Sequence, residues 1–468
     1  MTPGPAQDEV RRLIERIEEH DARVRALSAV NPHASADAET LDRESAAGHR
    51  RSPLHGRAVL VKDNVDTAGL ASTAGSLALA DAPPLRDAAL VRRLRDAGMV
   101  VLGKTNLSEW ANIRDGRSTS GWSAHGGLTR NPYALNRTAW GSSSGSGAAI
   151  AAGFAAYAVG TETDGSITAP AAACGLVGLK PTVGLVPTEG VVPISWTQDS
   201  PGPMALTVAD AAALLDAMAG TSIAPGLAAE PEGGLRGRRV GVPRDLWGGS
   251  PATDAAAERA LSALSGAGAV VVDSLSLPTL KDLDGEAELT VLLVELKVAL
   301  GRYLAARGGS VTSLADVIAF NREHSDEELL WFGQSLLEQA EQTEGVASSE
   351  YLASVGACAA AGVAELDRVL GEHQLDALLV PTMAPAPPID LVNGDPGGEG
   401  PGASTSSALA GAPILTVPME LAKGLPVAVS MWGARGSDAT LLELGLALES
   451  ARDRTTGPLP PPTFAEWV

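Results

Sequence analysis

Two short apolar runs, one on each side of an amphipathic segment, place the tightest limit on the fold of this chain. The runs are RAVLVK at 57–62 and MVVLGK at 99–104. Continuous apolar runs of this length are typical of strands that are buried on both faces. The segment RDAALVRRLRDA at 86–97 favours a helix, and Gly98 is placed to end it. A strand, a helix and a strand at this spacing predict a βαβ unit and a fold of the α/β class.

The same alternation continues along the chain and predicts one large layered domain over residues 1–468. Only 3% of the residues are aromatic, so Ala, Val and Leu must build most of the core. We find no internal repeat. Helices are expected at 7–29, 148–158, 208–219, 252–265, 286–305, 346–370 and 437–450, and further strands at 238–242, 269–273, 376–380, 413–417 and 425–432.

Within that domain we expect three parts. Residues 7–220 would form a first half, and the Pro/Gly-rich residues 221–237 a linker-like segment on the surface. Residues 238–468 would form a second half, which includes a mainly helical block at 284–372 and a Pro/Gly-rich loop at 384–403.

Charge and cysteine content exclude several classes of function. The net charge of −21 disfavours nucleic acid and anionic membrane surfaces as partners, because both need clustered Lys and Arg. No run of 18 apolar residues and no apolar signal segment is visible, so a soluble cytoplasmic protein is expected, with secretion as the alternative if a leader was removed. Cys174 and Cys358 are expected to be buried thiols. The sequence contains no cluster of metal ligands, so we expect neither a metal nor another cofactor.

The stretch WGSSSGSGAAIAAG at 140–153 places small polar residues directly before a good helix former. It could be a flexible linker, a helix cap, or a place where the backbone must approach another group closely. Residues 141–145 also fit the G-x-S-x-G pattern of a nucleophile elbow. That interpretation is weak, because the preceding residues are loop-like and neither His324 nor His373 has an obvious partner.

Two further stretches hold residues that could carry chemistry. GTETDGSITAP at 160–170 follows a predicted strand, and Pro170 is expected to prevent a helix through Ala169. Lys62 ends the first strand, at the edge where α/β proteins commonly place their sites. Taken singly, a serine in such a loop is more often part of a turn, and a lone lysine is more often solvated.

Together, these stretches resemble the amidase signature family. The resemblance rests on VKDN at 61–64, GSSSGS at 141–146 and TETDGSI at 161–167, in which Ser166 follows Ser142 by 24 residues. It covers nearly the whole chain. The segment KTNLSEWAN at 104–112 and the residues around the serines are most similar to those of bacterial peptide amidases, which remove ammonia from C-terminally amidated peptides. The resemblance implies one large mixed β-sheet covered by helices on both faces.

The resemblance also implies a Ser-Ser-Lys triad and an acyl-enzyme. Ser166 would be the nucleophile, Ser142 the bridging serine and Lys62 the base, with a cis peptide bond between Gly141 and Ser142. A serine needs a neighbouring base to become nucleophilic. Lysine, with an ordinary pKa of about 10.4, can act as that base near neutral pH only if burial keeps it uncharged.

The remaining site residues follow from the same resemblance. The backbone N–H groups that would stabilise an oxyanion belong to Thr163, Asp164 and Gly165. Here Asp164 replaces a glycine that most relatives carry, so its side chain must point away from the oxyanion. Thr168 stands where many relatives, but not the peptide amidases, have an arginine. The candidate substrate-binding residues are Asn112, Ser120, Gly121 and Ser143.

Hydrolysis of a carboxamide to acid and ammonia is therefore the expected activity, with a small or short-peptide amide as substrate. One alternative is the amidase subunit of a tRNA-dependent amidotransferase, although a charge of −21 suits a tRNA-linked assembly poorly. A non-catalytic binding protein would be expected to have lost at least one triad residue. A biosynthetic amidase for one metabolite stays open, as does the choice between monomer and homodimer.

Overall fold

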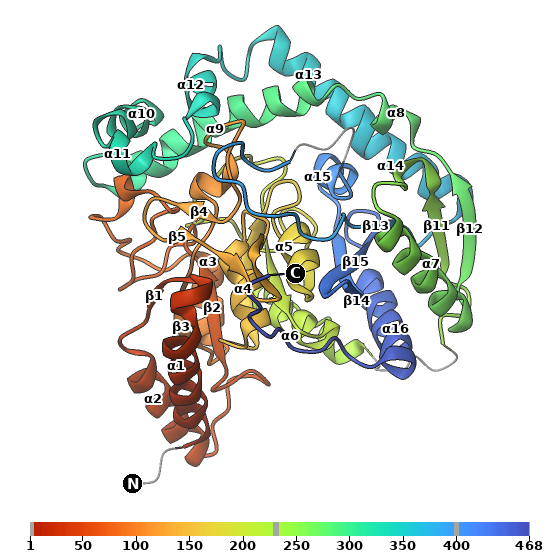
Figure 1. The fold of residues 1–468 in the computed structure, drawn as a ribbon, viewed down its shortest axis with the longest axis horizontal. Coiled ribbons are helices and arrows are strands. Elements are labelled where there is room, and N and C mark those ends of the chain that lie inside the picture. Colours follow the sequence, from red (N-terminus) through yellow and green to blue (C-terminus); the bar gives the residue numbers. More distant parts are fainter. Residues whose placement is uncertain (1–3, 228–233, 397–401, 468) are drawn as a thin grey trace.

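A computed structural model describes residues 4–227, 234–396 and 402–467. Parts of the expected linker at 221–237 and of the loop at 384–403 lie outside these ranges. Figure 1 shows a central sheet with helices packed around it. Its eleven strands lie in the order β1-β3-β2-β8-β10-β9-β14-β15-β13-β11-β12. Strands from both halves of the chain therefore share one sheet.

The predicted βαβ unit is confirmed. Strand β2 (Ala58–Lys62), helix α3 (Ala89–Asp96) and strand β3 (Val100–Thr105) follow one another, and the two strands pair in parallel. On its other side β2 pairs in parallel with β8 (Tyr157–Glu162). Every residue of β2 is buried, so its last residue, Lys62, lies inside the protein at the carboxyl end of a central strand.

Side chains of β2 alternate between two hydrophobic cores. Val59 and Val61 pack in the core that contains α3 and α6 (Val208–Ala219). Ala58 and Leu60 pack in the core that contains α1 (Pro5–Val24) and α4 (Ser144–Ala152). Because successive side chains of a strand point to opposite faces, the sheet is covered by helices on both faces. The mixed pairing and this layering confirm the expected fold class.

The other strands in the sheet are β1 (Leu27–Val30), β9 (Val177–Lys180), β10 (Ser200–Ala205), β11 (Arg239–Pro243), β12 (Val270–Leu275), β13 (Ala377–Pro381), β14 (Ile414–Ala422) and β15 (Leu425–Trp432). The other long helices are α2 (Ala34–Ala46), α7 (Pro251–Gly266), α14 (Glu365–His373) and α16 (Asp438–Thr456), and the short helices are α5 (Thr168–Cys174), α8 (Pro278–Lys281) and α15 (Thr405–Ala410).

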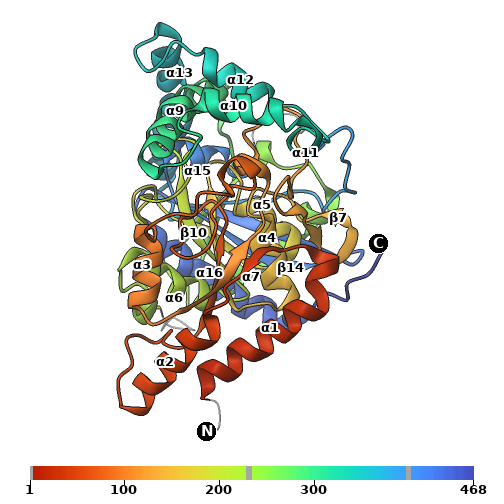
Figure 2. The same cartoon turned by 90° about the vertical axis from the view of Figure 1, so that its left-hand side faces the viewer.

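The helical block covers one end of the molecule, as both ribbon views show (Figures 1 and 2). It comprises α9 (Gly285–Arg307), α10 (Leu314–Glu323), α11 (Ser325–Glu328), α12 (Ser335–Gln342) and α13 (Ser349–Ala359). Leu296 and Leu300 of α9 share a hydrophobic cluster with Trp110 and Ile113 from the first half. The block therefore packs directly on loops that carry predicted site residues.

Several predicted boundaries are wrong, each for a local reason. Helix α1 ends at Val24 rather than at 29, because Arg25 takes a left-handed conformation and β1 begins at Leu27. Helix α4 begins at Ser144, inside the Ser/Gly stretch, and ends at Ala152, before β8. The single helix expected at 346–370 is interrupted by a π-helical turn at Ala360–Ala364.

The expectation that Pro170 prevents a helix is also wrong. Helix α5 begins at Thr168, so Pro170 lies in its first turn. A proline is tolerated there because the N–H groups of the first turn have no partner inside the helix. The helix that follows Ser166 therefore starts two residues after it.

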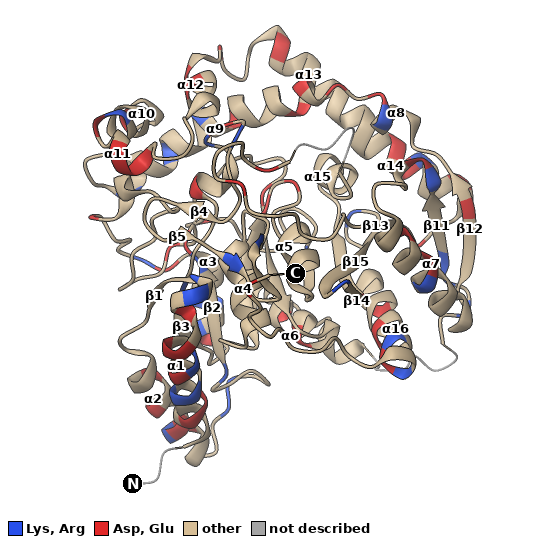
Figure 3. Ribbon diagram, viewed as in Figure 1, with Lys and Arg blue, Asp and Glu red and all other residues tan. Residues whose placement is uncertain are grey.

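Charged side chains are concentrated on the outer helices, for example along α1 and α16, whereas the central strands carry few of them (Figure 3). Both cysteines are free and buried, as expected. Among the described residues, no helix combines the length and the apolar character that a membrane crossing requires.

Candidate active site

Lys62 is enclosed by hydroxyl groups. Its Nζ lies 2.8 Å from Ser142 Oγ and 2.9 Å from Ser143 Oγ. It also lies 2.8 Å from Thr161 Oγ1 and 3.1 Å from the Thr161 carbonyl oxygen. Asn64 Nδ2 donates to the same Thr161 hydroxyl at 3.0 Å. An amine held in this way is fixed in position and in contact with a serine that could pass a proton to it.

Burial lowers the pKa of Lys62 to about 7, because the charged amine loses its contact with water. The carboxylates of Glu162 and Asp199 act in the opposite direction and raise the pKa of Lys62, but their effect is smaller. Lys62 forms no ion pair with a described residue within 4 Å. The amine is therefore partly neutral at neutral pH, as a lysine that accepts protons must be.

The Ser/Gly stretch passes close to three other segments. The peptide bond between Gly141 and Ser142 is cis, as the family resemblance implied. A Cβ atom on Gly141 would lie 2.1 Å from Ser108 Oγ, and one on Gly145 would lie 2.3 Å from the Ala26 carbonyl oxygen. At 145 the clash is with backbone, so only glycine fits there, whereas at 141 the side chains of Ser108 and Ser120 would have to move. Of the three interpretations of the loop, close backbone approach is therefore the one that the packing supports.

Ser166 lies against this loop, at the boundary with solvent. Its carbonyl oxygen accepts a hydrogen bond from the Ser143 N–H at 3.1 Å. Ser166 is partly exposed, whereas Ser142, Ser143 and Lys62 are fully buried. The exposed serine is the one that a substrate can reach, and the buried amine lies behind the two inner serines.

A buried carboxylate fixes the turn around Ser166. Glu162 Oε2 accepts hydrogen bonds of 2.7 Å from the N–H groups of Ile167 and Thr168, at the start of α5. These groups have no acceptor within the helix, so Glu162 satisfies donors that would otherwise be unpaired. Sequence reasoning did not assign Glu162 a role, although it lies within the quoted TETDGSI segment.

Asp164 turns its carboxylate away from the backbone of this turn. It accepts hydrogen bonds from the hydroxyls of Ser404 and, at 2.9 Å, Thr405. Gly165 has a φ of +81°, which is a left-handed conformation that suits glycine. Within the described ranges, no backbone oxygen accepts a hydrogen bond from the N–H of Asp164 or Gly165. Both N–H groups are thus available to an outside acceptor.

Asp199 links the turn at 163–165 to the loop at 194–199. Its carboxylate accepts hydrogen bonds from Thr163 Oγ1 at 2.7 Å and from the N–H groups of Ile194 and Ser195 at 2.8 and 3.0 Å. Burial raises the pKa of Asp199 to about 6, since the charged carboxylate is removed from water. No signal in the sequence identified Asp199, because its partners come together only in the folded chain.

The structure brings most of the predicted substrate-binding residues beside the serines. Ser143 contacts Lys62 directly. Gly121 N–H donates to Ser108 Oγ at 2.9 Å, and a Cβ on Gly141 would approach Ser120 Oγ to 2.8 Å, so both 120 and 121 adjoin the loop. Asn112 has a φ of +75°, and its buried Oδ1 has no partner among the described residues.

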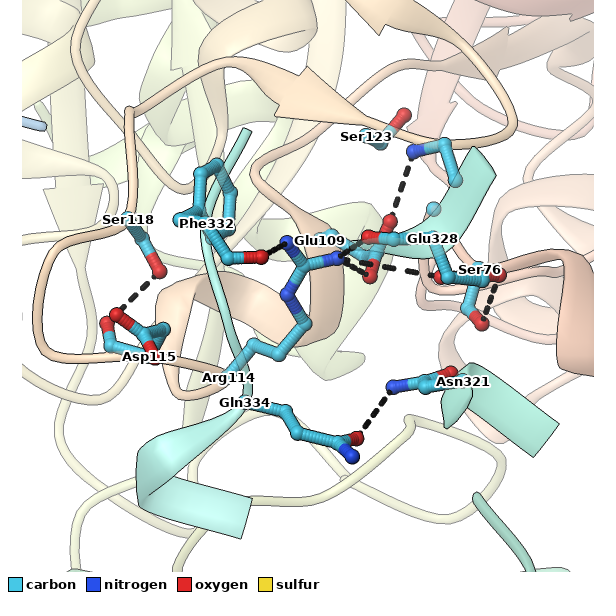
Figure 4. A network of polar contacts seen from close by, with 12 residues as sticks. Ser76, Glu109, Arg114, Asp115, Ser118, Ser123, Asn321, Glu328, Phe332 and Gln334 are labelled. Carbon is cyan, nitrogen blue, oxygen red and sulfur yellow. Dashed lines mark hydrogen bonds and ion pairs between the residues drawn. The ribbon is translucent and has the colours of Figure 1, made fainter. Parts of the chain in front are cut away.

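A buried ion network holds this side of the site against the helical block (Figure 4). Arg114 is completely buried and forms an ion pair with Glu109, while Glu328 lies 3.9 Å away. Its other donors bind the carbonyl oxygens of Glu328 and Phe332 at 2.5 and 3.1 Å. Burial raises the pKa of Glu109, and the charge of Arg114 opposes that rise. One arginine therefore compensates two buried carboxyl groups.

Replacing that arginine should destabilise the fold strongly. We expect Arg114→Met to lower the free energy of unfolding by about 3–5 kcal/mol, because two carboxyl groups stay buried without a cation. Arg117→Met is the matched control: Arg117 is exposed, and its replacement should change stability by at most about 0.5 kcal/mol. Thermal and urea unfolding curves of both variants measure the difference. Equal curves would contradict the compensating role of Arg114.

Thr161 and Asn64 are the polar residues nearest Lys62 that sequence reasoning did not single out. Both lie within segments that it quoted, VKDN and TETDGSI. What the sequence could not reveal is their convergence, since Asn64 follows β2 whereas Thr161 belongs to β8. Among the described residues, no group of three or more His, Cys, Asp or Glu is arranged to hold a metal ion.

Comparison with known proteins places this geometry in a family. The sequence model named Amidase matches residues 8–442. The chain belongs to the amidase family. A solved structure of native peptide amidase from Stenotrophomonas maltophilia is 46% identical to it, with a TM-score of 0.89, covering 98% of this amidase and 95% of that chain.

Two further relatives mark the range of activities in the family. The peptide amidase PAM, solved in complex with the competitive inhibitor chymostatin, is also 46% identical, with a TM-score of 0.89 and coverage of 98% and 95%. A glutamyl-tRNA(Gln) amidotransferase subunit from Myxococcus xanthus is 35% identical, covering 98% of this amidase and 97% of that protein. The protein is an amidohydrolase of the amidase signature type, as its sequence predicted.

Proposed function

We propose that this amidase hydrolyses the C-terminal carboxamide of short peptides to a free acid and ammonia. The observation that carries the catalytic part is the buried Lys62 amine, 2.8 Å from Ser142 Oγ, with a pKa lowered to about 7. The peptide part is supported by 46% identity over 98% of the chain to a protein named peptide amidase.

In the proposed acylation step Ser166 Oγ attacks the amide carbonyl carbon. Its proton passes to Ser142 Oγ, while the Ser142 proton passes to neutral Lys62. The negative charge on the former carbonyl oxygen is stabilised by the N–H groups of Asp164 and Gly165, together with that of Thr163. The C–N bond then breaks, and the proton returns along the same path to the departing ammonia.

Deacylation reverses these roles. A water molecule attacks the ester carbonyl carbon and gives its proton to the Ser142–Lys62 pair. Ser166 Oγ leaves and recovers a proton, which releases the peptide acid. Glu162 acts as a positioning residue in this scheme, because it holds the first turn of α5 and thereby the backbone beside Ser166.

Ammonia release from a panel of amides tests the proposed function. The panel pairs N-acetyl dipeptide amides with acetamide, benzamide and glutamine. Rapid turnover of the dipeptide amides is the expected result, with slow turnover of the others. Turnover of only acetamide or benzamide would agree with the proposed catalytic mechanism but would contradict the proposal that peptide amides are the substrates.

The activity should fall on the acid side of neutrality. Lys62 accepts a proton only in its neutral form, so kcat/KM should decline below about pH 7, where the amine becomes charged. The charged groups facing it are Glu162 and Asp199, both of which raise its pKa. The Asp199→Asn variant should therefore shift the acid limb to lower pH. Rates measured between pH 5 and 9 on an uncharged substrate check this, and a flat profile would contradict a lysine base.

A second candidate is the ammonia-producing subunit of a tRNA-dependent amidotransferase. The observation that favours it is 35% identity, across nearly the whole length of both chains, to a protein of that name. Glutaminase activity that appears only with partner subunits would support it. Turnover of peptide amides by the isolated chain at rates of about 1 per second or more would argue against it, since such values are typical of enzymes acting on their own substrates.

A further inference from the structure

Two hydroxyl groups at the start of α15 reach the turn that precedes Ser166. They belong to Ser404 and Thr405, which follow their partner in that turn by 240 and 241 residues. Asp164 Oδ1 accepts a hydrogen bond from Ser404 Oγ, and Asp164 Oδ2 accepts one from Thr405 Oγ1 at 2.9 Å. Each oxygen of the carboxylate therefore has its own hydroxyl donor.

One of these hydroxyls also lies against the next residue of the turn. A Cβ atom on Gly165 would lie 3.2 Å from Ser404 Oγ, so this hydroxyl is close to two successive residues of the turn. Ser404 and Thr405 are buried, and Thr405 Oγ1 also accepts a hydrogen bond from the Gly402 N–H at 3.1 Å. Both hydroxyls are thus fixed in place beside the residues whose N–H groups the proposed mechanism uses.

A carboxylate at this position is unfavourable for amide hydrolysis unless it is held in place. The tetrahedral intermediate places a negative charge beside the N–H groups of Asp164 and Gly165. A free Asp164 carboxylate would repel that charge. It would also compete for a nearby backbone N–H, as aspartate side chains commonly do in turns. A glycine, the residue that the family resemblance implies for this position, has neither effect.

We propose that Ser404 and Thr405 are positioning residues, which hold the Asp164 carboxylate away from the oxyanion and so keep the backbone N–H groups of the turn free for the substrate. The inference rests on the proposed function, which assigns the N–H groups of Asp164 and Gly165 to the oxyanion. Hydrogen bonds to a charged acceptor are stronger than those between neutral groups, and one bond to each oxygen fixes the direction of the whole carboxylate. Neither hydroxyl has to touch the substrate to have this effect.

The test removes both hydroxyls in the double variant Ser404→Ala/Thr405→Val and measures hydrolysis of N-acetyl-phenylalaninamide. We expect kcat to fall by at least about tenfold and KM to change by less than about twofold, because the oxyanion forms only after the substrate has bound. Ser406→Ala is the matched control. Ser406 lies on the same helix and is also buried, but its Oγ has no hydrogen-bond partner among the described residues, so its loss should leave kcat unchanged.

A third substitution separates this role from a merely structural one. Asp164→Gly, added to the double variant, removes the carboxylate that the hydroxyls restrain, so kcat should rise again by about fivefold or more. A loss of activity caused by distortion of α15 would not be reversed by removing a side chain from another segment. The single variants Ser404→Ala and Thr405→Val each leave one hydrogen bond to Asp164, so their kcat values should lie between those of the wild type and the double variant.

Two results would overturn the positioning role and leave the proposed function intact: a wild-type kcat in the double variant, or a loss of kcat that Asp164→Gly does not reverse. If the wild type hydrolysed only another amide of the panel, the proposed peptide substrate would be wrong, and the same variants assayed on that amide would still test the two hydroxyls. Circular dichroism and urea unfolding of each variant confirm that the enzymes being compared are folded.

Discussion

Ser166→Ala should abolish amide hydrolysis and leave the fold unchanged. The variant lacks the oxygen that would form the acyl-enzyme, and loss of the nucleophile in serine hydrolases lowers kcat by a factor on the order of 10⁶. Ser166 is partly exposed just before α5, and the hydrogen bonds of Glu162 to this turn come from the N–H groups of Ile167 and Thr168 and from the Thr168 hydroxyl, not from the Ser166 hydroxyl. Removal of one hydroxyl there should therefore cost little stability.

Ammonia release on N-acetyl-phenylalaninamide, with the wild type and the variant at equal concentration, measures the effect. Ser262→Ala is the control, because Ser262 is exposed on α7, far along the chain from the site. It should have wild-type activity. If Ser166→Ala kept more than about 1% of the rate, another residue would have to be the nucleophile. Circular dichroism and thermal unfolding confirm that any loss is not due to misfolding.

Lys62→Met should reduce kcat by about 10²–10⁴-fold, the range usual for a general base. Methionine has nearly the volume of lysine, so it fills the buried position without an amine. In the variant, Ser143 Oγ keeps its hydrogen bond to the Thr161 carbonyl oxygen and Thr161 Oγ1 keeps the one from Asn64, whereas Ser142 Oγ loses the one partner that it has among the described residues. The fall in kcat should be larger than any loss of stability in the variant can explain.

The pH profile separates a base from a merely structural lysine. In Lys62→Met the residual activity should no longer decline near pH 7, because the group whose titration limits the wild type is absent. If the acid limb persisted unchanged, a different group would be responsible for it. The exposed Lys281→Met is a suitable control variant, and its profile should match that of the wild type.

The strands β2 and β3, which carry part of the site, could be predicted because short patterns of apolar residues determine them. The run AVLVK is buried in full, and the parallel pairing of β2 with β3 follows from the helix between them. The end of α1 could not be predicted, since Leu27 continues the helical periodicity but is used by β1. Pairing with β3 outweighs the helical pattern there, which is a tertiary effect.

The triad was predictable only through the family resemblance. Taken alone, Lys62 was more plausibly a solvated charge, and the sequence near it contains no sign that Ser142, Ser143 and Thr161 would surround it. Asp199 was not predictable at all. It contacts Thr163 across 36 residues of sequence, from the loop at 194–199. The division of the chain into two halves with a linker at 221–237 stays a prediction.

Because the side chains of β2 pack alternately in two cores, the parts of the site should unfold at different stages. Local opening in proteins exchanges amide hydrogens at loops and chain ends long before it reaches central strands. Lys62 is the last residue of a strand whose neighbours pack on both faces, so its position can be lost only when the sheet itself comes apart. The base therefore belongs to the slowest-exchanging part of the molecule, whereas Ser166 belongs to a turn on its rim. Partial unfolding would disable this enzyme by losing the turn while the lysine stays in place.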